Sequence, residues 1–285
     1  MIFRIVFYSI FLPAVFLVAL SLWGFWQVTH PTKTTSELTP FDLDWQFQQV
    51  TLTTRDNLSL DSWFVPSTRK TDKAVILLHD YGSEKSELLY TAAFLRRTYN
   101  LFFLDFRYFG NSQGNHTSLG FDEREDVQAA ITYLKARGMS SIGLLGFSYG
   151  GSIALLMPPE SKEIKAVVAS APIANLDLMS GVYFRKIPFL TDILVRFTRY
   201  WALLLYSIDE GKITPEIAVK KTQTPTFIIA SLQDEVILVE NARRLEKDLR
   251  NNKSAQVLIY DREVHEPLEA DPFESQILKF FAKNL

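Results

Sequence analysis

The pentapeptide Gly146-Phe147-Ser148-Tyr149-Gly150 constrains the fold of this chain more than any other feature of its sequence. It lies between residues 141–147, a short apolar run typical of a buried strand, and residues 150–156, whose small side chains favour a helix packed tightly on a sheet. A serine on a sharp strand-to-helix turn needs residues without side chains two positions before and after it, so that its hydroxyl can project into a site. The pattern therefore predicts a nucleophile elbow centred on Ser148. The alternative is a packing turn with an idle serine.

The composition limits what the chain can bind. With 285 residues, 47% of them hydrophobic, it can bury one large core, and we expect one catalytic domain with an N-terminal tail. The formal net charge is −2, and lysine and arginine form no dense cluster, so the sequence indicates no positive patch that would attract a polyanion. Nucleic acid is therefore not an expected partner. The absence of cysteine excludes disulfides, thiolate metal sites and a cysteine nucleophile. The sequence implies no metal ion and no organic cofactor.

The N-terminal segment predicts a membrane anchor. Residues 5–26 form an uncharged, mostly apolar stretch that is long enough to span a bilayer, and Trp23 and Trp26 are aromatic residues of the kind found at its interface. A cleaved signal peptide ending near residue 21 is the competing interpretation, but the apolar run continues beyond that point. We therefore predict an uncleaved transmembrane anchor over residues 1–28, followed by a linker over residues 29–44.

The anchor implies a single-pass membrane protein. Arg4 is the only charge on the upstream side of the apolar stretch. The positive-inside rule places this end in the cytoplasm, and it places the catalytic domain, residues 45–285, on the non-cytoplasmic side.

Apolar strand-like runs alternate with helix-length segments along the rest of the chain, as in a mainly parallel α/β sheet. Residues 46–53 and 58–65 alternate polar and apolar positions around a turn at 55–57, which predicts an antiparallel hairpin. Six further runs are apolar almost throughout, as strands covered on both faces require: residues 74–78, 101–104, 142–145, 166–169, 225–229 and 256–259. Helices are expected at residues 86–97, 121–137, 149–157, 239–251 and 272–283. The sequence thus predicts an eight-stranded, mostly parallel sheet with helices on both faces.

Residues 173–224 do not fit this alternation. They stand where one helix should join two strands, before the seventh strand, and they carry many aromatic residues among leucines. They predict a short helical insertion that forms a lid over the site, or equally a long crossover helix pair that covers the sheet edge. Charged residues such as Arg196 and Arg199 disfavour a second membrane span, while peripheral contact with lipid stays open.

A serine hydroxyl needs a base within hydrogen-bond reach and a third group that orients the base. Of the four histidines in the chain, His265 follows the last predicted strand, and Asp234 follows the strand before it. Ser148, Asp234 and His265 therefore stand, in that order, at the carboxyl ends of three strands, which is the arrangement of a catalytic triad. Taken singly, Asp234 could cap the following helix and His265 could be a surface loop residue.

Acyl transfer also needs N–H donors for the developing oxyanion. We expect the backbone amide of Tyr149 to be one donor and that of Tyr81, in the loop after strand 74–78, to be the other. His79 at the start of this loop is expected to hold it by hydrogen bonds and not to act as a base. Asp80 would oppose negative charge in the site if it pointed inward, so we expect it to point away and bond its own loop.

With the elbow, the order of the triad and this loop, residues 45–285 resemble the α/β-hydrolase superfamily. The segment from Asp105 to Ser112 is similar to the Asp-x-Arg-x-x-Gly-x-Ser turn of membrane-anchored α/β-hydrolase-domain serine hydrolases and of serine aminopeptidase-like proteins. Because the turn is mainly structural in such proteins, the resemblance implies that Asp105 and Arg107 are a loop-ordering pair and not catalytic groups. One departure is Asp80, since family members usually have glycine after the histidine of the oxyanion loop.

The resemblance implies esterase, thioesterase, lipase-like or peptidase activity. We expect a serine esterase or thioesterase, of class EC 3.1 in preference to 3.4, that acts through an acyl-Ser148 intermediate on a small-molecule or lipid-like acyl substrate. The aromatic insertion would offer an apolar wall, and the anchor would hold the site near lipid. The alternatives are a serine peptidase or aminopeptidase-like hydrolase, and a non-catalytic membrane-anchored scaffold that kept the fold.

Overall fold

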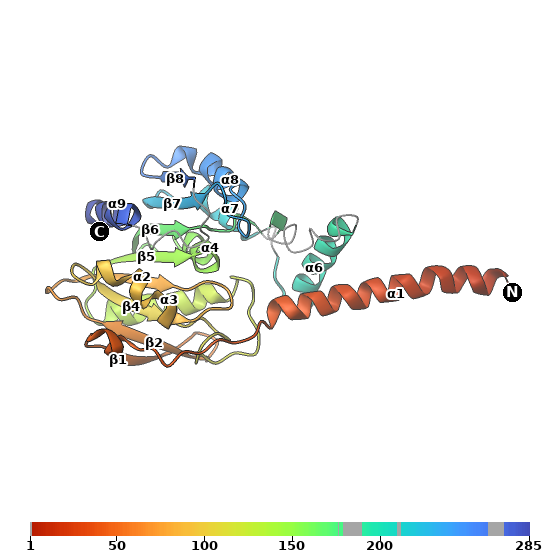
Figure 1. The fold of residues 1–285 in the computed structure, drawn as a ribbon, viewed down its shortest axis with the longest axis horizontal. Coiled ribbons are helices and arrows are strands. Elements are labelled where there is room, and N and C mark those ends of the chain that lie inside the picture. Colours follow the sequence, from red (N-terminus) through yellow and green to blue (C-terminus); the bar gives the residue numbers. More distant parts are fainter. Residues whose placement is uncertain (1, 176, 179–189, 210–211, 262–270) are drawn as a thin grey trace.

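One eight-stranded sheet forms the centre of the molecule (Figure 1). The structure, a computed structural model, describes residues 2–175, 177–178, 190–209, 212–261 and 271–285. The strand order is β1-β2-β4-β3-β5-β6-β7-β8, with β1 and β2 antiparallel, β2 and β4 antiparallel, and all other neighbours parallel. The strands are β1 (Gln48–Thr53), β2 (Ser59–Val65), β3 (Lys73–Leu78), β4 (Asn100–Leu104), β5 (Ser141–Phe147), β6 (Ile164–Ser170), β7 (Thr226–Ser231) and β8 (Gln256–Tyr260). The predicted α/β-hydrolase fold is confirmed.

The two faces of the sheet bury separate clusters of apolar side chains, because alternate residues of each strand point to opposite faces. On one face, Ile76, Phe102 and Leu144 pack with α3 (Glu123–Ala136), α4 (Tyr149–Leu156) and α8 (Glu240–Asp248). On the other face, their strand neighbours Val75, Phe103 and Leu145 pack with α2 (Leu88–Thr91) and α9 (Asp271–Asn284). This explains why the parallel strands are apolar throughout: both sides of each strand are buried.

Most helices lie where the sequence predicts them, with one difference. The helix expected at residues 86–97 is split into η2 (Lys85–Glu87), α2 and η3 (Ala93–Leu95), which are short pieces. Glu84 starts the segment by accepting a hydrogen bond from the backbone of Ser86, and Ala92, with φ −103° and ψ 1°, interrupts the helical geometry. The pieces still bury Leu88, Leu89 and Leu95 against the sheet.

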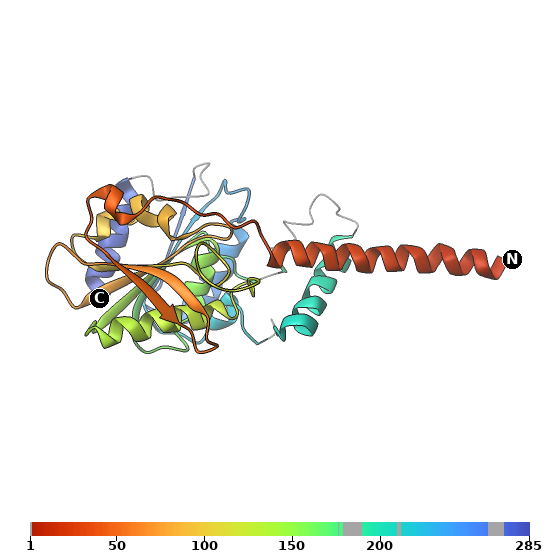
Figure 2. The same ribbon diagram turned by 90° about the horizontal axis from the view of Figure 1, so that it is seen from below.

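The N-terminal segment forms one helix, α1 (Ile2–Thr29), and Phe7–Thr29 is long and apolar enough to cross a membrane. At 1.5 Å per residue this stretch is about 35 Å long, against about 30 Å of bilayer hydrocarbon. The helix projects away from the α/β body (Figures 1 and 2). After it, the chain runs against the body: Thr34 Oγ1 donates to the carbonyl of Gly82 at 2.7 Å, and Leu38 and Leu43 pack on the core. The expected linker is thus in contact with the domain.

Two helices of the insertion are described, α6 (Thr191–Tyr206) and α7 (Pro215–Val219). Residues 176, 179–189 and 210–211 of this segment lie outside the described residues. α6 lies beside the end of α1 that adjoins the body, on the anchor's side of the molecule (Figures 1 and 2). The role of the insertion as a lid stays a prediction.

Candidate active site

Ser148 sits on a strained turn between β5 and α4. Its backbone has φ 48° and ψ −107°, in a region that side-chain-bearing residues rarely occupy, and its N–H donates to the carbonyl of Ser170 at 2.7 Å. A Cβ at Gly146 would lie 2.3 Å from the carbonyl oxygen of Gly150, and a Cβ at Gly150 would lie 2.3 Å from that of Leu78. The glycines are therefore required by close backbone contact, as the motif predicts.

The loop after β6 is tied to the same turn through Ser152. Ser152 Oγ donates to the carbonyl of Ser148 at 2.9 Å and accepts from the backbone N–H of Ile173 at 2.8 Å. The Ser152 hydroxyl thus acts both as donor and as acceptor, and these two hydrogen bonds fix its position. Ser148 itself is buried, with 7% of its surface exposed.

His79 holds the loop after β3, as expected. Its Nδ1 lies 2.7 Å from the carbonyl oxygen of Asp80, and its Nε2 lies 3.2 Å from the backbone nitrogen of Phe106. Because an N–H donor faces Nε2, the proton of the neutral ring belongs on Nδ1, which donates to Asp80. Burial lowers the pKa of His79, more than neighbouring carboxylates raise it, and this favours the neutral ring. A neutral histidine with both nitrogens bonded is a structural residue.

The carboxylate of Asp80 occupies the point on which the two predicted oxyanion donors converge. Its Oδ1 accepts from the backbone N–H of Tyr81 at 2.6 Å and from that of Tyr149 at 3.2 Å. The expectation that Asp80 points away from the site was therefore wrong, although it does bond its own loop. The physical reason is that two N–H groups aimed at one position attract a negative oxygen, and an aspartate side chain at this position is short enough to supply it.

Hydrogen bonds of their hydroxyl groups hold the side chains of Tyr81 and Tyr149 in place. The Tyr149 hydroxyl lies 2.8 Å from Thr117 Oγ1, and burial together with Glu123 raises the pKa of Tyr149 well above its usual value. The Tyr81 hydroxyl donates to the carbonyl of Val28, in the last turn of α1, at 2.6 Å. Sequence reasoning missed Thr117, because it stands 32 positions from Tyr149 and no spacing rule joins the two segments.

Asp234 follows β7 and is buried, with 5% of its surface exposed. Its Oδ1 accepts from the backbone N–H groups of Val236 and Ile237, each at 2.8 Å. These bonds order the turn that follows β7, whereas α8 begins only at Glu240, so Asp234 does not cap that helix. His265 lies outside the described residues. The triad of Ser148, Asp234 and His265 therefore stays a prediction.

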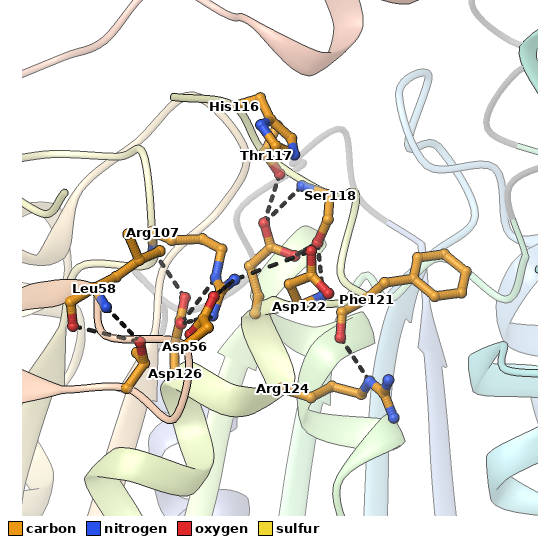
Figure 3. A network of polar contacts seen from close by, with 12 residues as sticks. Asp56, Leu58, Arg107, His116, Thr117, Ser118, Phe121, Asp122, Arg124 and Asp126 are labelled. Carbon is orange, nitrogen blue, oxygen red and sulfur yellow. Dashed lines mark hydrogen bonds and ion pairs between the residues drawn. The ribbon is translucent and has the colours of Figure 1, made fainter. Parts of the chain in front are cut away.

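Asp105 and Arg107 order the loop after β4, but not by pairing with each other. Asp105 accepts from Lys85 Nζ at 2.6 Å, in an ion pair whose two side chains are buried. Arg107 donates from NH2 and Nε to Asp126 at 2.7 and 2.9 Å, and from NH1 to Asp56 at 2.8 Å (Figure 3). These networks hold the loop that carries the Phe106 amide to His79.

A small apolar cavity of about 30 Å³ lies beside the elbow, lined by Tyr149, Ser152 and Ile173 together with Phe121 and residues of the loop before α7. Drug-sized ligand pockets take about 300–1,000 Å³, so this cavity would have to widen to hold an acyl chain. Within the described ranges, no group of three or more histidine, aspartate or glutamate side chains is placed to hold a metal ion.

Known proteins and solved structures are similar to this chain in sequence and in fold. The model of the X-Pro dipeptidyl-peptidase (S15) family matches residues 29–191, and that of the prolyl oligopeptidase family matches residues 111–285. An esterase of Pyrococcus furiosus is 26% identical, with a TM-score of 0.74 over 90% of this chain and 99% of its own. An acylaminoacyl peptidase of Pyrococcus horikoshii, 17% identical, has a TM-score of 0.65 over 85% of this chain and 42% of its own, which shows the fold alone.

The curated relatives are matched over part of their length. An uncharacterized membrane protein of Saccharomyces cerevisiae is 26% identical over 70% of this chain and 66% of its own length. Protein bem46 of Schizosaccharomyces pombe is 24% identical over 70% of this chain and 64% of its own length. The two family models together cover residues 29–285, and each matches more than half of the chain. With the sheet order and the strained elbow, these matches establish that the chain belongs to the α/β-hydrolase superfamily of serine hydrolases.

Proposed function

We propose that the protein hydrolyses a carboxylic ester or thioester through an acyl intermediate on Ser148. The observation that carries this proposal is the convergence of the Tyr81 and Tyr149 amides on one negatively charged oxygen, directly beside the elbow serine. Two backbone donors aimed at a common point are what acyl transfer needs for its oxyanion. Here the Asp80 carboxylate marks that point.

In the proposed reaction, Ser148 Oγ attacks the acyl carbonyl carbon while its proton passes to His265. The carbonyl electron pair moves onto the oxygen, which takes the two hydrogen bonds from Tyr81 and Tyr149. Collapse of this intermediate breaks the bond to the alcohol or thiol, which leaves with the proton from His265. Water then repeats the sequence and releases the acid, and Asp234 orients His265 in both halves.

Asp80 has to leave the oxyanion position before the substrate carbonyl can enter it. Hydrogen bonds to a charged group contribute about 1.5–3 kcal/mol each to stability, so displacing the carboxylate is a considerable cost. We therefore interpret the arrangement as a closed form of the site. The contact of Asp80 with the two amides also favours a second candidate function, that of a scaffold without turnover. Replacement of Asp80 distinguishes the hydrolase from the scaffold.

The proposal of an ester or thioester substrate rests on likeness to the esterase, which this chain matches over 99% of its length. The peptidase structure is matched over only 42% of its length. The descriptions of both family models favour a peptidase instead. Hydrolysis of short and long p-nitrophenyl esters, an acyl thioester and aminoacyl p-nitroanilides by the same preparation, with Ser148→Ala as the blank, distinguishes these classes. Turnover confined to the anilides would contradict the ester proposal.

We also propose that α1 anchors the protein in a membrane. The length and composition of the helix support this proposal, and one relative carries the name of a membrane protein. The proposed placement of the domain on the non-cytoplasmic side rests on Arg4 alone. Because the chain has no cysteine, the exposed Lys253→Cys variant can be labelled in intact cells with a membrane-impermeant maleimide. Labelling without lysis supports this orientation, and labelling only after lysis contradicts it.

A further inference from the structure

α6 presents an apolar face that the described residues do not cover. Along this helix the large exposed apolar side chains are Ile193 (43%), Tyr200 (54%), Leu203 (55%), Leu204 (57%) and Leu205 (51%). Residues 193, 200 and 204 are spaced by seven and four positions, which places them on one face of the helix. A contiguous apolar face of this kind marks a surface that contacts a partner or a membrane.

The opposite side of α6 is fixed against α1. Ala202 is buried against Phe25, and Trp201 Nε1 donates to Ser21 Oγ at 3.0 Å. Tyr206 packs on Phe25 with 5.4 Å between ring centroids. All of these contacts come from the C-terminal part of α6, which packs on the last turns of the candidate membrane span, and α6 lies obliquely beside α1 (Figures 1 and 2).

This packing places the C-terminal part of α6 at the same depth as the end of the span. At the level of Ser21 and Phe25, the side chains of Leu22, Trp23 and Trp26 on α1 are exposed by 40%, 60% and 56%. Exposed apolar side chains are thus present on both helices near the place where they pack together. Transfer of apolar surface out of water is favourable by about 25 cal/mol of free energy per Å². Burial of the exposed side chains of both helices in the same membrane is therefore favoured.

We propose that α6 is a second lipid-contacting element, which lies in the bilayer interface beside α1 with Ile193, Tyr200 and Leu204 toward the acyl chains. The proposal rests on the membrane anchoring by α1 proposed above. It makes the described part of the insertion a membrane-facing element in addition to any role as a lid.

The charges on α6 agree with an interfacial position. Asp192, Arg196 and Arg199 are exposed, and Arg199 NH1 lies 3.2 Å from a carboxylate oxygen of Asp177. Arginine can lay its aliphatic stem along an apolar surface while its guanidinium stays in the headgroup region. Three charges in 16 residues would be costly at the centre of a bilayer but not at its border.

This placement connects the membrane to the oxyanion residues. The carbonyl of Val28 accepts from the Tyr81 hydroxyl, and that of Thr29 accepts from the backbone N–H of Thr117, whose hydroxyl meets Tyr149. Phe121, which lines the cavity beside the elbow, packs in the same cluster as Phe25 and Ala202. An acyl lipid that leaves the bilayer along α6 would therefore arrive at the proposed acyl site.

The cysteine-free chain allows a direct test. Single variants Tyr200→Cys and Leu204→Cys carry a nitroxide in the full-length protein, reconstituted in phosphatidylcholine vesicles with and without phosphatidylglycerol. Power-saturation EPR then compares collisions with oxygen, which partitions into lipid, and with a water-soluble nickel chelate. Phe16→Cys on α1 is the lipid reference, and Lys253→Cys is the aqueous reference.

We expect both α6 labels to collide with oxygen at least threefold more readily, relative to the nickel chelate, than the label at residue 253. A lipid-like signal at residue 16 with a water-like signal on α6 would overturn the proposal and leave the anchor intact. Low accessibility to both reagents on α6 would overturn it too, because a protein partner would then cover this face. A water-like signal at residue 16 would refute the anchor itself, and the α6 proposal with it.

Discussion

Asp80 Oδ1 accepts a hydrogen bond from the backbone N–H of Tyr149, 3.2 Å away, in the place that we propose for a substrate oxyanion. The same oxygen is 2.6 Å from the backbone nitrogen of Tyr81. The two proposed oxyanion donors thus point to one position, and a side chain of the protein itself holds that position. A glycine in place of Asp80, as in the family that the sequence resembles, would have no side chain to hold it.

Replacing Asp80 should open the oxyanion site. We expect Asp80→Gly to raise kcat/KM for p-nitrophenyl esters by about 10- to 100-fold, because one or two charge-assisted hydrogen bonds no longer have to be broken. Asp80→Asn, whose neutral oxygen is a weaker acceptor, should have a kcat/KM between those of the parent and Asp80→Gly. Steady-state kinetics of the three proteins in the same detergent give the result. A folded Asp80→Gly protein less active than the parent would mean that Asp80 takes part in turnover.

The close backbone contact at the elbow predicts a stability effect. Gly150→Ala would force a methyl group to 2.3 Å from the carbonyl oxygen of Leu78, and overpacking of this kind costs about 1–3 kcal/mol or more. We expect the melting temperature to fall by about 5 °C or more. Gly24→Ala on α1, where nothing lies within 4 Å, is the matched control and should melt like the parent. Equal melting temperatures for all three proteins would show that the elbow is less tightly packed than described.

The buried ion pair of Lys85 predicts a second stability effect. Lys85→Met leaves Asp105 buried without its cation, and breaking a buried pair from one side costs about 3–5 kcal/mol. We expect a fall of about 6 °C or more in melting temperature. Lys135→Met removes the half-exposed pair with Glu163 and should change it by about 2 °C or less, because surface pairs contribute about 0–1 kcal/mol. Thermal unfolding followed by circular dichroism measures both variants. Similar shifts for the two would contradict the assignment of Lys85 as a buried anchor of the loop.

His79 predicts how stability depends on pH. Burial lowers its pKa in the folded protein, whereas the unfolded chain titrates near 6.5. The contribution of the neutral ring is complete above pH 6.5 and is lost as the pH falls from there toward the folded pKa, because the unfolded state takes up the proton first. The advantage of the parent over His79→Gln in free energy of unfolding should shrink by up to about 1.4 kcal/mol per pH unit in this window. Urea unfolding at pH 7.5, 6.5, 6.0 and 5.5 measures it. An advantage that stays constant, or grows on acidification, would show that the ring is not buried in its neutral form.

The sequence predicts the sheet and the elbow because both depend on local patterns. Apolar runs covered on both faces, such as β3 and β5, leave little choice of environment. The motif places Gly146 and Gly150 by spacing alone, although Gly150 meets a distant residue, Leu78, in the fold. The hairpin of β1 and β2 follows in the same way from alternation around a short turn.

The rest depends on contacts between distant segments. Asp80 bonds to the amide of Tyr149, 69 positions away, as well as to that of its neighbour Tyr81, and the sequence alone cannot show on which side of the loop the Tyr149 amide lies. The partners of Asp105 and Arg107 come from other parts of the chain, so a motif that contains both residues suggested a pair that does not form. The packing of α6 on α1 joins residues 180 positions apart and follows from no periodicity.

The central claim is that Ser148 is an activated nucleophile. Its most direct test is labelling of the full-length protein in membranes with a fluorophosphonate, followed by mapping of the modified peptide by mass spectrometry, with Ser148→Ala, His265→Ala and Asp80→Gly in parallel. We predict modification at Ser148, its loss in the first two variants, and faster labelling in Asp80→Gly. A folded protein whose Ser148 remains unmodified, in the parent and in Asp80→Gly alike, would contradict the claim and support the non-catalytic scaffold.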